Sequence, residues 1–329
     1  MTALLATRVM RADAAAAAEA ARVLAMGGLV AFPTETVYGL GADATNGRAV
    51  ARLYEAKGRP AFNPLIAHVV DQAAARTLAR FGADAARLAA AFWPGPLTLV
   101  LPKAAGCPVA ALATAGLDTI AVRVPSHRVA HDILTAFGKP VVAPSANRSG
   151  HVSPTTAEHV QADLSGRIDL IIDGGAAPVG VESTIVACLD QPELLRPGGV
   201  PRATIERALG HKLAEPSGEI SGGEDTPLAP GMLASHYAPR TRLRLNISHV
   251  APGEALLAFG PALVEGGGRS GKMLNLSAGG DLVEAAANLF SHLRALDAAG
   301  GSAIAVMPIP ADGLGEAIND RLARAAAGR

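Results

Sequence analysis

The stretch from Leu29 to His68 constrains the fold more than any other part of the chain, because two short apolar runs enclose a polar turn and a basic loop. The first run, LVAF, is typical of a buried strand and ends at Pro33, which cannot donate a hydrogen bond in mid-sheet. A polar segment with Thr36 follows directly, at the point where an α/β sheet opens its ligand crevice. The sequence therefore predicts a ligand site between two strands.

A helix is predicted between these two strands. Gly39 and Gly41 predict a sharp backbone turn, and Asn46 predicts the N-cap of a helix that runs to about Ala56. Residues 57–60, KGRP, then place two cations in a loop that leads into the second strand. Loops fixed at both ends often carry function, so an anion site is one interpretation. The alternative is two solvated charges at a helix C-terminus, where the helix dipole favours cations.

Other polar groups recur at predicted strand ends. Arg123 lies in the alternating run TIAVRV, so it needs an anionic partner, either a bound anion or a structural ion pair. The segment PVVAPSANRSG predicts a strand that enters a loop able to bind phosphate oxygens or to form a capped turn. DLIIDGG and GVESTIV predict a strand pair around a glycine-rich turn, with Ser183 at a strand entry and Arg196 downstream.

Composition excludes several classes of protein. With 329 residues, half of them apolar, the chain is expected to form about two globular domains. Lys plus Arg equals Asp plus Glu at 29 each, so the charge expected of a dedicated nucleic-acid binder is missing. The two cysteines lack CxxC spacing, which disfavours a zinc cluster or disulfide framework. The Ala-rich opening lacks a long apolar run, so we expect a cytoplasmic protein without membrane contact.

The composition changes between residues 213 and 225, where Pro, Ser, Gly and Glu predominate and predict a linker. Beyond it, the runs LRLNIS, ALLAFG, KMLNLS and AIAVMPIP are expected to be strands. They alternate with helices expected at about Asp281–Ala299 and Gly315–Ala326, which predicts a small α/β domain. No chemistry is visible in this second domain.

The motifs PTETVYGLG and AKGRPAFNPLIAHV resemble those of the YrdC-like threonylcarbamoyl-adenylate synthase family. Similar blocks follow: FWPGPLTLVL, AGLDTIAVRVPSH, APSANRSGHVSPT, GVESTIV and LLRPG. APGMLASHYAP resembles the linker of the long form, which has an extra C-terminal domain. The resemblance implies an α/β fold with a YrdC-like twisted mixed-sheet catalytic domain (residues 1–208), a linker or lid (209–239) and a smaller Rossmann-like α/β domain (240–329).

The resemblance implies an L-threonylcarbamoyladenylate synthase, a nucleotidyltransferase that joins L-threonine, bicarbonate or CO2, and ATP into threonylcarbamoyl-AMP and pyrophosphate. The product would serve threonylcarbamoyl modification of the adenosine next to the anticodon of tRNA. Mg²⁺ is expected with ATP, and tRNA and the downstream threonylcarbamoyl-transferase proteins are potential partners. Because a carbamate and a triphosphate are both anions, such a site needs cations for each.

The resemblance also implies roles for individual residues. The catalytic set is Lys57, Arg59 and His68. The threonine-binding set is Thr36, His68, Arg123, Ala143 through its backbone, and Ser183. The ATP-binding set is Arg59, Asn63, Thr119, Ser145, Asn147, Ser153, Arg196 and Tyr237. No protein ligand to a metal is expected.

Tyr237 is expected to contact the nucleotide as part of a lid, because a mere tether needs neither an aromatic ring nor the stiffening Pro230 and Pro239. The alternative is that this segment docks the second domain onto the first. Two other functions stay open. One is a non-catalytic module that binds double-stranded RNA or tRNA, which the even charge disfavours. The other is a carbamoyl-transfer enzyme of the hydrogenase-maturation type, which usually carries zinc-finger modules that this sequence lacks.

Overall fold

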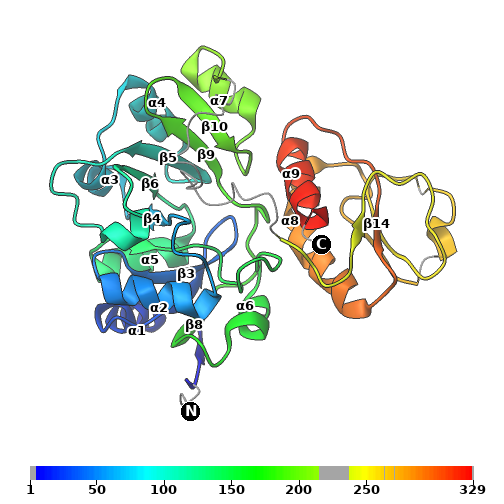
Figure 1. Cartoon of the computed structure of the whole chain (residues 1–329), viewed down its shortest axis with the longest axis horizontal. Helices are drawn as coiled ribbons and strands as arrows, with labels where there is room; N and C mark the ends of the chain where they lie inside the picture. The colour runs from blue at the N-terminus through cyan, green and yellow to red at the C-terminus, as the bar shows by residue number, and fades with distance from the viewer. Residues whose placement is uncertain (1–4, 215–236, 263, 270, 328–329) are drawn as a thin grey trace.

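The computed structural model describes residues 5–214, 237–262, 264–269 and 271–327, without the side chain of residue 269. These residues form a larger N-terminal domain and a smaller C-terminal domain (Figure 1). Within them, no helix is both long and apolar enough to span a bilayer.

The N-terminal domain is built on a ten-stranded mixed sheet with the strand order β1-β8-β2-β3-β7-β4-β6-β5-β9-β10. Its strands are β1 (Arg8–Arg11), β2 (Val30–Pro33), β3 (Tyr38–Asp43), β4 (Ile66–His68), β5 (Leu97–Pro102), β6 (Thr119–Arg123), β7 (Val141–Val142), β8 (Leu170–Asp173), β9 (Thr184–Cys188) and β10 (Pro192–Arg196). Its helices are α1 (Ala14–Ala25), α2 (Gly47–Lys57), α3 (Gln72–Leu78), α4 (Ala83–Phe92), the 3-10 turn η1 (Ala111–Thr114), α5 (Arg128–Phe137), α6 (Ala157–Leu164) and α7 (Arg202–Leu209). The mixed sheet confirms the predicted fold class.

Two apolar cores cover the two faces of this sheet. Val30 and Phe32 of β2 pack in the core that contains α1 and α5, whereas Ala31 between them packs in the core that contains α2. Successive strand residues point to opposite faces, so a strand buried on both faces is apolar throughout. This is why the LVAF run carries no alternation.

The glycines of β3 correct one prediction. Gly39 and Gly41 do not form a turn: they lie inside β3, which pairs antiparallel with β2. A Cβ on Gly41 would lie 2.7 Å from a ring carbon of Phe32 and 3.0 Å from a methyl of Val141. Glycine is therefore needed for close packing of the strands. The chain turns earlier, where the Thr34 hydroxyl donates to the carbonyl of Val37 at 2.7 Å.

The caps of α2 agree with the sequence. The Asn46 side chain accepts hydrogen bonds from the backbone amides of Arg48 and Ala49, at 3.0 and 3.2 Å. Gly58 ends the helix in the left-handed conformation, with φ of 61°. The helix thus begins and ends as its capping residues predict.

The predicted pairing of the strands in DLIIDGG and GVESTIV is wrong. β8 pairs in parallel with β1 and β2, whereas β9 pairs in parallel with β5 and antiparallel with β10. Seven places of the sheet order separate the two strands, although they are neighbours in the sequence. The segment between them runs from β8 to β9 and carries Glu182 and Ser183 at its end, directly before β9.

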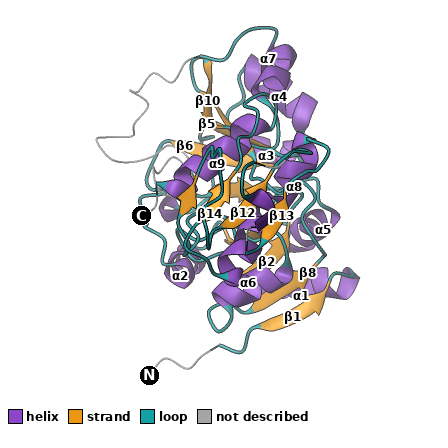
Figure 2. Cartoon of the chain, turned by 90° about the vertical axis from the view of Figure 1, so that its right-hand side faces the viewer, coloured by secondary structure: helices purple, strands orange, loops and turns teal. Residues whose placement is uncertain are grey.

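The C-terminal domain has a four-stranded parallel sheet in the order β11-β14-β12-β13. Its elements are β11 (Leu243–Arg244), β12 (Ala255–Ala258), the 3-10 turn η2 (Gly267–Arg269), β13 (Met273–Asn275), α8 (Leu282–Ala299), β14 (Ile304–Val306) and α9 (Gly315–Ala326). A parallel sheet with covering helices confirms the smaller Rossmann-like α/β domain. Figure 2 shows this domain in front of the larger sheet.

The two domains are tightly packed. Arg202 of α7 forms an ion pair with Glu316 of α9 at 2.7 Å, and Arg294 of α8 forms one with Asp163 of α6 at 2.8 Å. A Cβ on Gly180 would lie 2.2 Å from a backbone oxygen of α8, so only glycine fits there. The apolar core of the C-terminal domain also includes residues of the N-terminal domain. Groups of the second domain can therefore reach sites of the first.

Candidate active site

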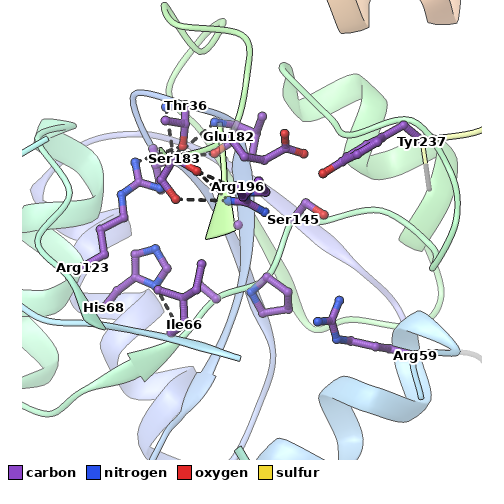
Figure 3. A pocket seen from close by; sticks show the side chains of 15 residues that line it. Thr36, Arg59, Ile66, His68, Arg123, Ser145, Glu182, Ser183, Arg196 and Tyr237 are labelled. Atoms are coloured by element: carbon purple, nitrogen blue, oxygen red, sulfur yellow. Dashed lines mark hydrogen bonds between the residues drawn. The ribbon is translucent and has the colours of Figure 1, made fainter. Parts of the chain in front are cut away.

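One cavity gathers most of the candidate site residues at the ends of β4, β6, β9 and β10 (Figure 3). The predicted residues on its wall are Thr36, Arg59, His68, Arg123, Ala143, Ser145, Ser183, Arg196 and Tyr237. They come from segments far apart in the sequence, and the strand order brings them together. Arg123 and His68 lie on one side of the cavity, and Arg59 and Tyr237 lie on the other (Figure 3).

Arg123 dominates the first side. Its Nη2 donates to Glu35 Oε1 at 2.7 Å and to Thr36 Oγ1 at 3.0 Å, and its Nε donates to the carbonyl of Gly95 at 3.3 Å. Nη1 makes no hydrogen bond to another described residue. The structural ion pair of Arg123 is therefore confirmed, and Arg123 also lines the cavity, where its contact with a bound anion stays a prediction.

The charge states of this side follow from burial and from that guanidinium. Burial opposes ionisation of Glu35, but Arg123 outweighs it and holds the pKa of Glu35 below its ordinary value. Burial, reinforced by Arg123, lowers the pKa of His68 to about 3, so its imidazole is neutral near pH 7. His68 Nδ1 lies 3.1 Å from the carbonyl oxygen of Ile66. Because that oxygen only accepts, Nδ1 carries the proton and Nε2 is the acceptor.

Arginines also line the second side. The Arg196 guanidinium donates to the backbone carbonyl of Ser183 at 2.9 Å and to its hydroxyl at 3.2 Å. Arg59 donates to the carbonyls of Asn63 and Pro64 at 3.3 and 3.1 Å, and burial lowers its pKa to about 10. Both arginines stay charged at neutral pH. This side therefore presents two cations, together with Ser145 and Tyr237.

Five predicted residues are buried or half-buried away from the cavity wall: Lys57, Asn63, Thr119, Asn147 and Ser153. Lys57 Nζ donates to the carbonyls of Ser145 and Asn147, so it fastens α2 to the loop that carries Ser145. The side-chain oxygens of Asn63, Thr119 and Asn147 are buried without a hydrogen-bond partner among the described residues. Buried polar atoms normally find partners, so these three oxygens are candidates for contact with a ligand.

The predicted ligand sets leave out two carboxylates of the site, Glu35 and Glu182, although both lie in polar segments that the sequence indicates. Glu35 follows Thr34 in the polar turn, and a carboxylate directly after a buried strand indicates a residue of the site. Glu182 lies on the cavity wall and accepts from Ser153 Oγ at 2.6 Å and from Arg321 Nε at 2.8 Å. Its partner Arg321 belongs to α9 of the other domain, so no local pattern reveals the pair.

Tyr237 is the described end of the predicted lid, since residues 215–236 lie outside the described part of the chain. Its ring is 1% exposed, stacks on Phe290 of α8 at 5.6 Å between centroids, and faces the Arg321 guanidinium at 5.3 Å. The backbone of Tyr237 is left-handed, with φ of 64°. The ring therefore packs on the C-terminal domain and borders the cavity, and its contact with a nucleotide stays a prediction.

The cavity offers little to a metal ion. The described residues include no group of three or more His, Cys, Asp or Glu side chains that could hold one. Glu182, the carboxylate on the cavity wall, is already paired with Arg321. This donor set does not fit a protein-bound metal centre.

Comparison with known proteins then identifies the family. A family model described as Telomere recombination, which groups Sua5, YciO and YrdC proteins, matches residues 22–198. A second model, described as Threonylcarbamoyl-AMP synthase, C-terminal domain, matches residues 200–327. The chain belongs to the Sua5–YciO–YrdC family. It has the long form of that family, with the additional C-terminal domain.

Relatives of this family cover nearly the whole chain. A threonylcarbamoyl-AMP synthase of Pyrococcus abyssi is 43% identical over 326 residues, which cover 93% of this chain and 92% of the relative. One of Bacillus subtilis is 42% identical over 331 residues, which cover 95% and 93%. The crystal structure of P. abyssi Sua5 complexed with L-threonine superposes with a TM-score of 0.88 at 38% identity, covering 98% of each chain.

Proposed function

We propose that this protein is an L-threonylcarbamoyladenylate synthase, which forms threonylcarbamoyl-AMP and pyrophosphate from L-threonine, bicarbonate or CO2, and ATP. The observation that carries the proposal is one cavity with two separate sets of anion-binding groups. Arg123 and His68 stand on one side and Arg59 stands on the other, while Arg196 lies between them and donates to the Ser183 hydroxyl (Figure 3). The relatives that match nearly the whole chain bear the name threonylcarbamoyl-AMP synthase.

The first set suits an amino acid. The planar guanidinium of Arg123 offers Nη1 to a carboxylate, while its ion pair with Glu35 holds the fork in place. The Thr36 and Ser183 hydroxyls lie on the same wall. Neutral His68 presents Nε2 as a hydrogen-bond acceptor, which suits the hydroxyl or amino group of threonine.

The second set suits the phosphates of ATP. In the proposed reaction the threonine amine adds to CO2 and loses a proton, which gives a carbamate. A carbamate oxygen then attacks the α-phosphorus, the bond to the bridging oxygen breaks, and pyrophosphate leaves. Arg59 and Arg196 would offset the repulsion between the two anions and stabilise the negative charge that develops on the phosphate oxygens.

We further propose that Mg²⁺ arrives with ATP and is held by the nucleotide's own oxygens, because the residues that the structure describes include no carboxylate cluster for it. The adenylate would supply the threonylcarbamoyl group for the adenosine next to the anticodon of tRNA. Proteins that transfer this group to tRNA would be its partners, and the cytoplasm would be its compartment.

Pyrophosphate release from ATP tests the reaction, with each substrate omitted in turn. We expect release to require threonine and bicarbonate together. Equal release without threonine, or ATP binding without any release, would contradict the proposal. Release of phosphate from carbamoyl phosphate, measured in parallel, would instead indicate a carbamoyl-transfer enzyme.

Two variants test the division of the cavity. Arg59→Ala should raise the KM for ATP, whereas Arg123→Ala should raise the KM for threonine. Lysine should restore neither fully, because it lacks the planar fork. Each variant is titrated with the two substrates separately, and equal effects on both KM values in both variants would refute the assignment.

A further inference from the structure

Arg321 of the C-terminal domain contacts three segments around the cavity. Its side chain is 0% exposed. Nε donates to Glu182 at 2.8 Å, Nη2 donates to the carbonyl of Pro197 at 2.9 Å, and Nη1 pairs with the neighbouring Asp320. The flat face of the guanidinium lies 5.3 Å from the centroid of Tyr237. All three nitrogens and the face of this group are therefore occupied.

The contacts of Arg321 with Glu182, Pro197 and Tyr237 adjoin the cavity. Pro197 directly follows Arg196, and Glu182 and Tyr237 are themselves on the wall. The guanidinium of Arg321 on α9 thus contacts the loop of Glu182, the loop of Pro197 and the ring of Tyr237 at the same time.

The charge on Glu182 gives Arg321 a second effect. Burial alone would raise the pKa of Glu182, but Arg321 and Arg196 lower it to about 2, so the carboxylate is charged at neutral pH. Arg196 lies on the same cavity wall and donates to the carbonyl of Ser183, the residue after Glu182, at 2.9 Å. Without Arg321, Glu182 would be a buried anion whose charge acts on Arg196. It would then compete with a phosphate group for Arg196 and repel that phosphate.

We propose that Arg321 is a positioning residue of the active site, which neutralises Glu182 and so weakens the attraction of that carboxylate for Arg196 and its repulsion of the phosphates of ATP. This inference rests on the proposed function and adds to it. The C-terminal domain, in which the sequence shows no chemistry, supplies a group on which nucleotide binding depends.

The test compares Arg321→Met with the double variant Arg321→Met and Glu182→Gln, and with Arg202→Met as a matched control. Arg202→Met also removes a cation between the domains, but Arg202 pairs with Glu316 and is not on the cavity wall. We expect Arg321→Met to weaken ATP binding about tenfold or more, because the unpaired Glu182 carboxylate then attracts Arg196 and repels the phosphates. The KM for threonine should change by less than about threefold, because Arg123 is untouched. The control should match the wild type in both.

Rescue distinguishes this mechanism from a purely structural role. If Arg321 acts by neutralising Glu182, the double variant should regain most of the ATP affinity that Arg321→Met loses. It should do so although it lacks the hydrogen bonds of Arg321 to Glu182 and to Pro197. An ATP affinity in the double variant no better than in Arg321→Met would overturn the proposal. Equal increases in both KM values would also overturn it, as would a wild-type ATP affinity in Arg321→Met.

Two further measurements keep the test independent of folding and of the reaction. Circular dichroism establishes whether Arg321→Met is folded. If it is not, the ATP affinity of the double variant is compared with that of Glu182→Gln alone. The two affinities should be similar, because neither variant has a charged Glu182. ATP affinity is measured by calorimetry without threonine. If the wild type binds ATP but releases no pyrophosphate, the proposed reaction fails while the affinities still test Arg321. If the wild type does not bind ATP, both proposals fail.

Discussion

Replacing Arg123 by methionine removes the cation of a buried ion pair and leaves the Glu35 carboxylate without a counter-charge. The two side chains are 4% and 7% exposed, and the nitrogen–oxygen distance is 2.7 Å. Charges about 4 Å apart attract by about 4 kcal/mol at an effective dielectric constant of about 20. Breaking a buried pair at one partner costs about 3–5 kcal/mol in other proteins. We therefore expect Arg123→Met to lower the free energy of unfolding by about 3–5 kcal/mol near neutral pH.

The effect should depend on pH in a defined direction. In the wild type the pKa of Glu35 is lowered, so the pair contributes stability above the pKa of the unfolded carboxyl, about 4.3, and loses it as the pH falls further. In the variant, burial acts without Arg123 and raises the pKa of Glu35. The variant therefore gains stability relative to the wild type as the pH is lowered from about 7.5 to about 5.

Urea unfolding followed by circular dichroism measures this difference, without substrates so that ligand binding does not contribute. Glu35→Gln combined with Arg123→Met is the matched control, because it removes both charges and should recover most of the loss. The same loss at about pH 7.5 and about pH 5, with no recovery in the double variant, would refute the assignment of the loss to an unpaired carboxylate.

Three further predictions use the same unfolding measurement. Gly41→Ala should lower the free energy of unfolding by about 1–3 kcal/mol, because the added methyl would press on the Phe32 ring. The control Gly82→Ala, whose added methyl would have no atom within 4 Å, should change it by less than about 0.5 kcal/mol. Equal effects of the two substitutions would contradict the packing argument. Asn46→Ala should cost about 1 kcal/mol through loss of the helix cap, and Asn46→Asp, which can still accept, should cost less. His68 has a pKa of about 3, so its contribution is present above the unfolded pKa of 6.5 and is lost as the pH falls toward 3. His68→Gln should therefore lose less stability than the wild type between about pH 7 and about pH 5, and parallel losses would show that His68 is not a buried neutral group.

The sequence predicts those parts of the fold that depend on neighbouring residues. Asn46 and Gly58 mark the ends of α2, because capping is a contact between a side chain or a flexible backbone and the nearest turn. The sequence does not predict in the same way which strands pair. β8 and β9 follow one another in the chain but lie far apart in the sheet, because strand pairing depends on contacts between residues that are distant in the sequence.

The same distinction separates the site residues that the sequence indicates from those that it does not. Arg123 is recognisable because a charged residue interrupts an apolar strand. Its partner Glu35 lies 88 residues away, and the partner of Glu182 lies 139 residues away. Such pairs form only once the sheet and the second domain are in place. Motifs can therefore indicate the wall of the cavity, but not the ion pairs that hold its charges.

The pairing of Glu182 with Arg321 also sets an order of events on the ribosome. A chain grows at about 5–20 residues per second, so the 139 residues between the two side chains correspond to a delay on the order of 10 seconds. During this time the N-terminal domain can begin to fold, with Ser153 as a hydrogen-bond donor to Glu182 but without the counter-charge of Arg321. The cavity wall around Glu182 acquires its final charge balance only when α9 has been synthesised and has docked. A nascent chain thus exposes the cavity before Arg321 pairs with Glu182.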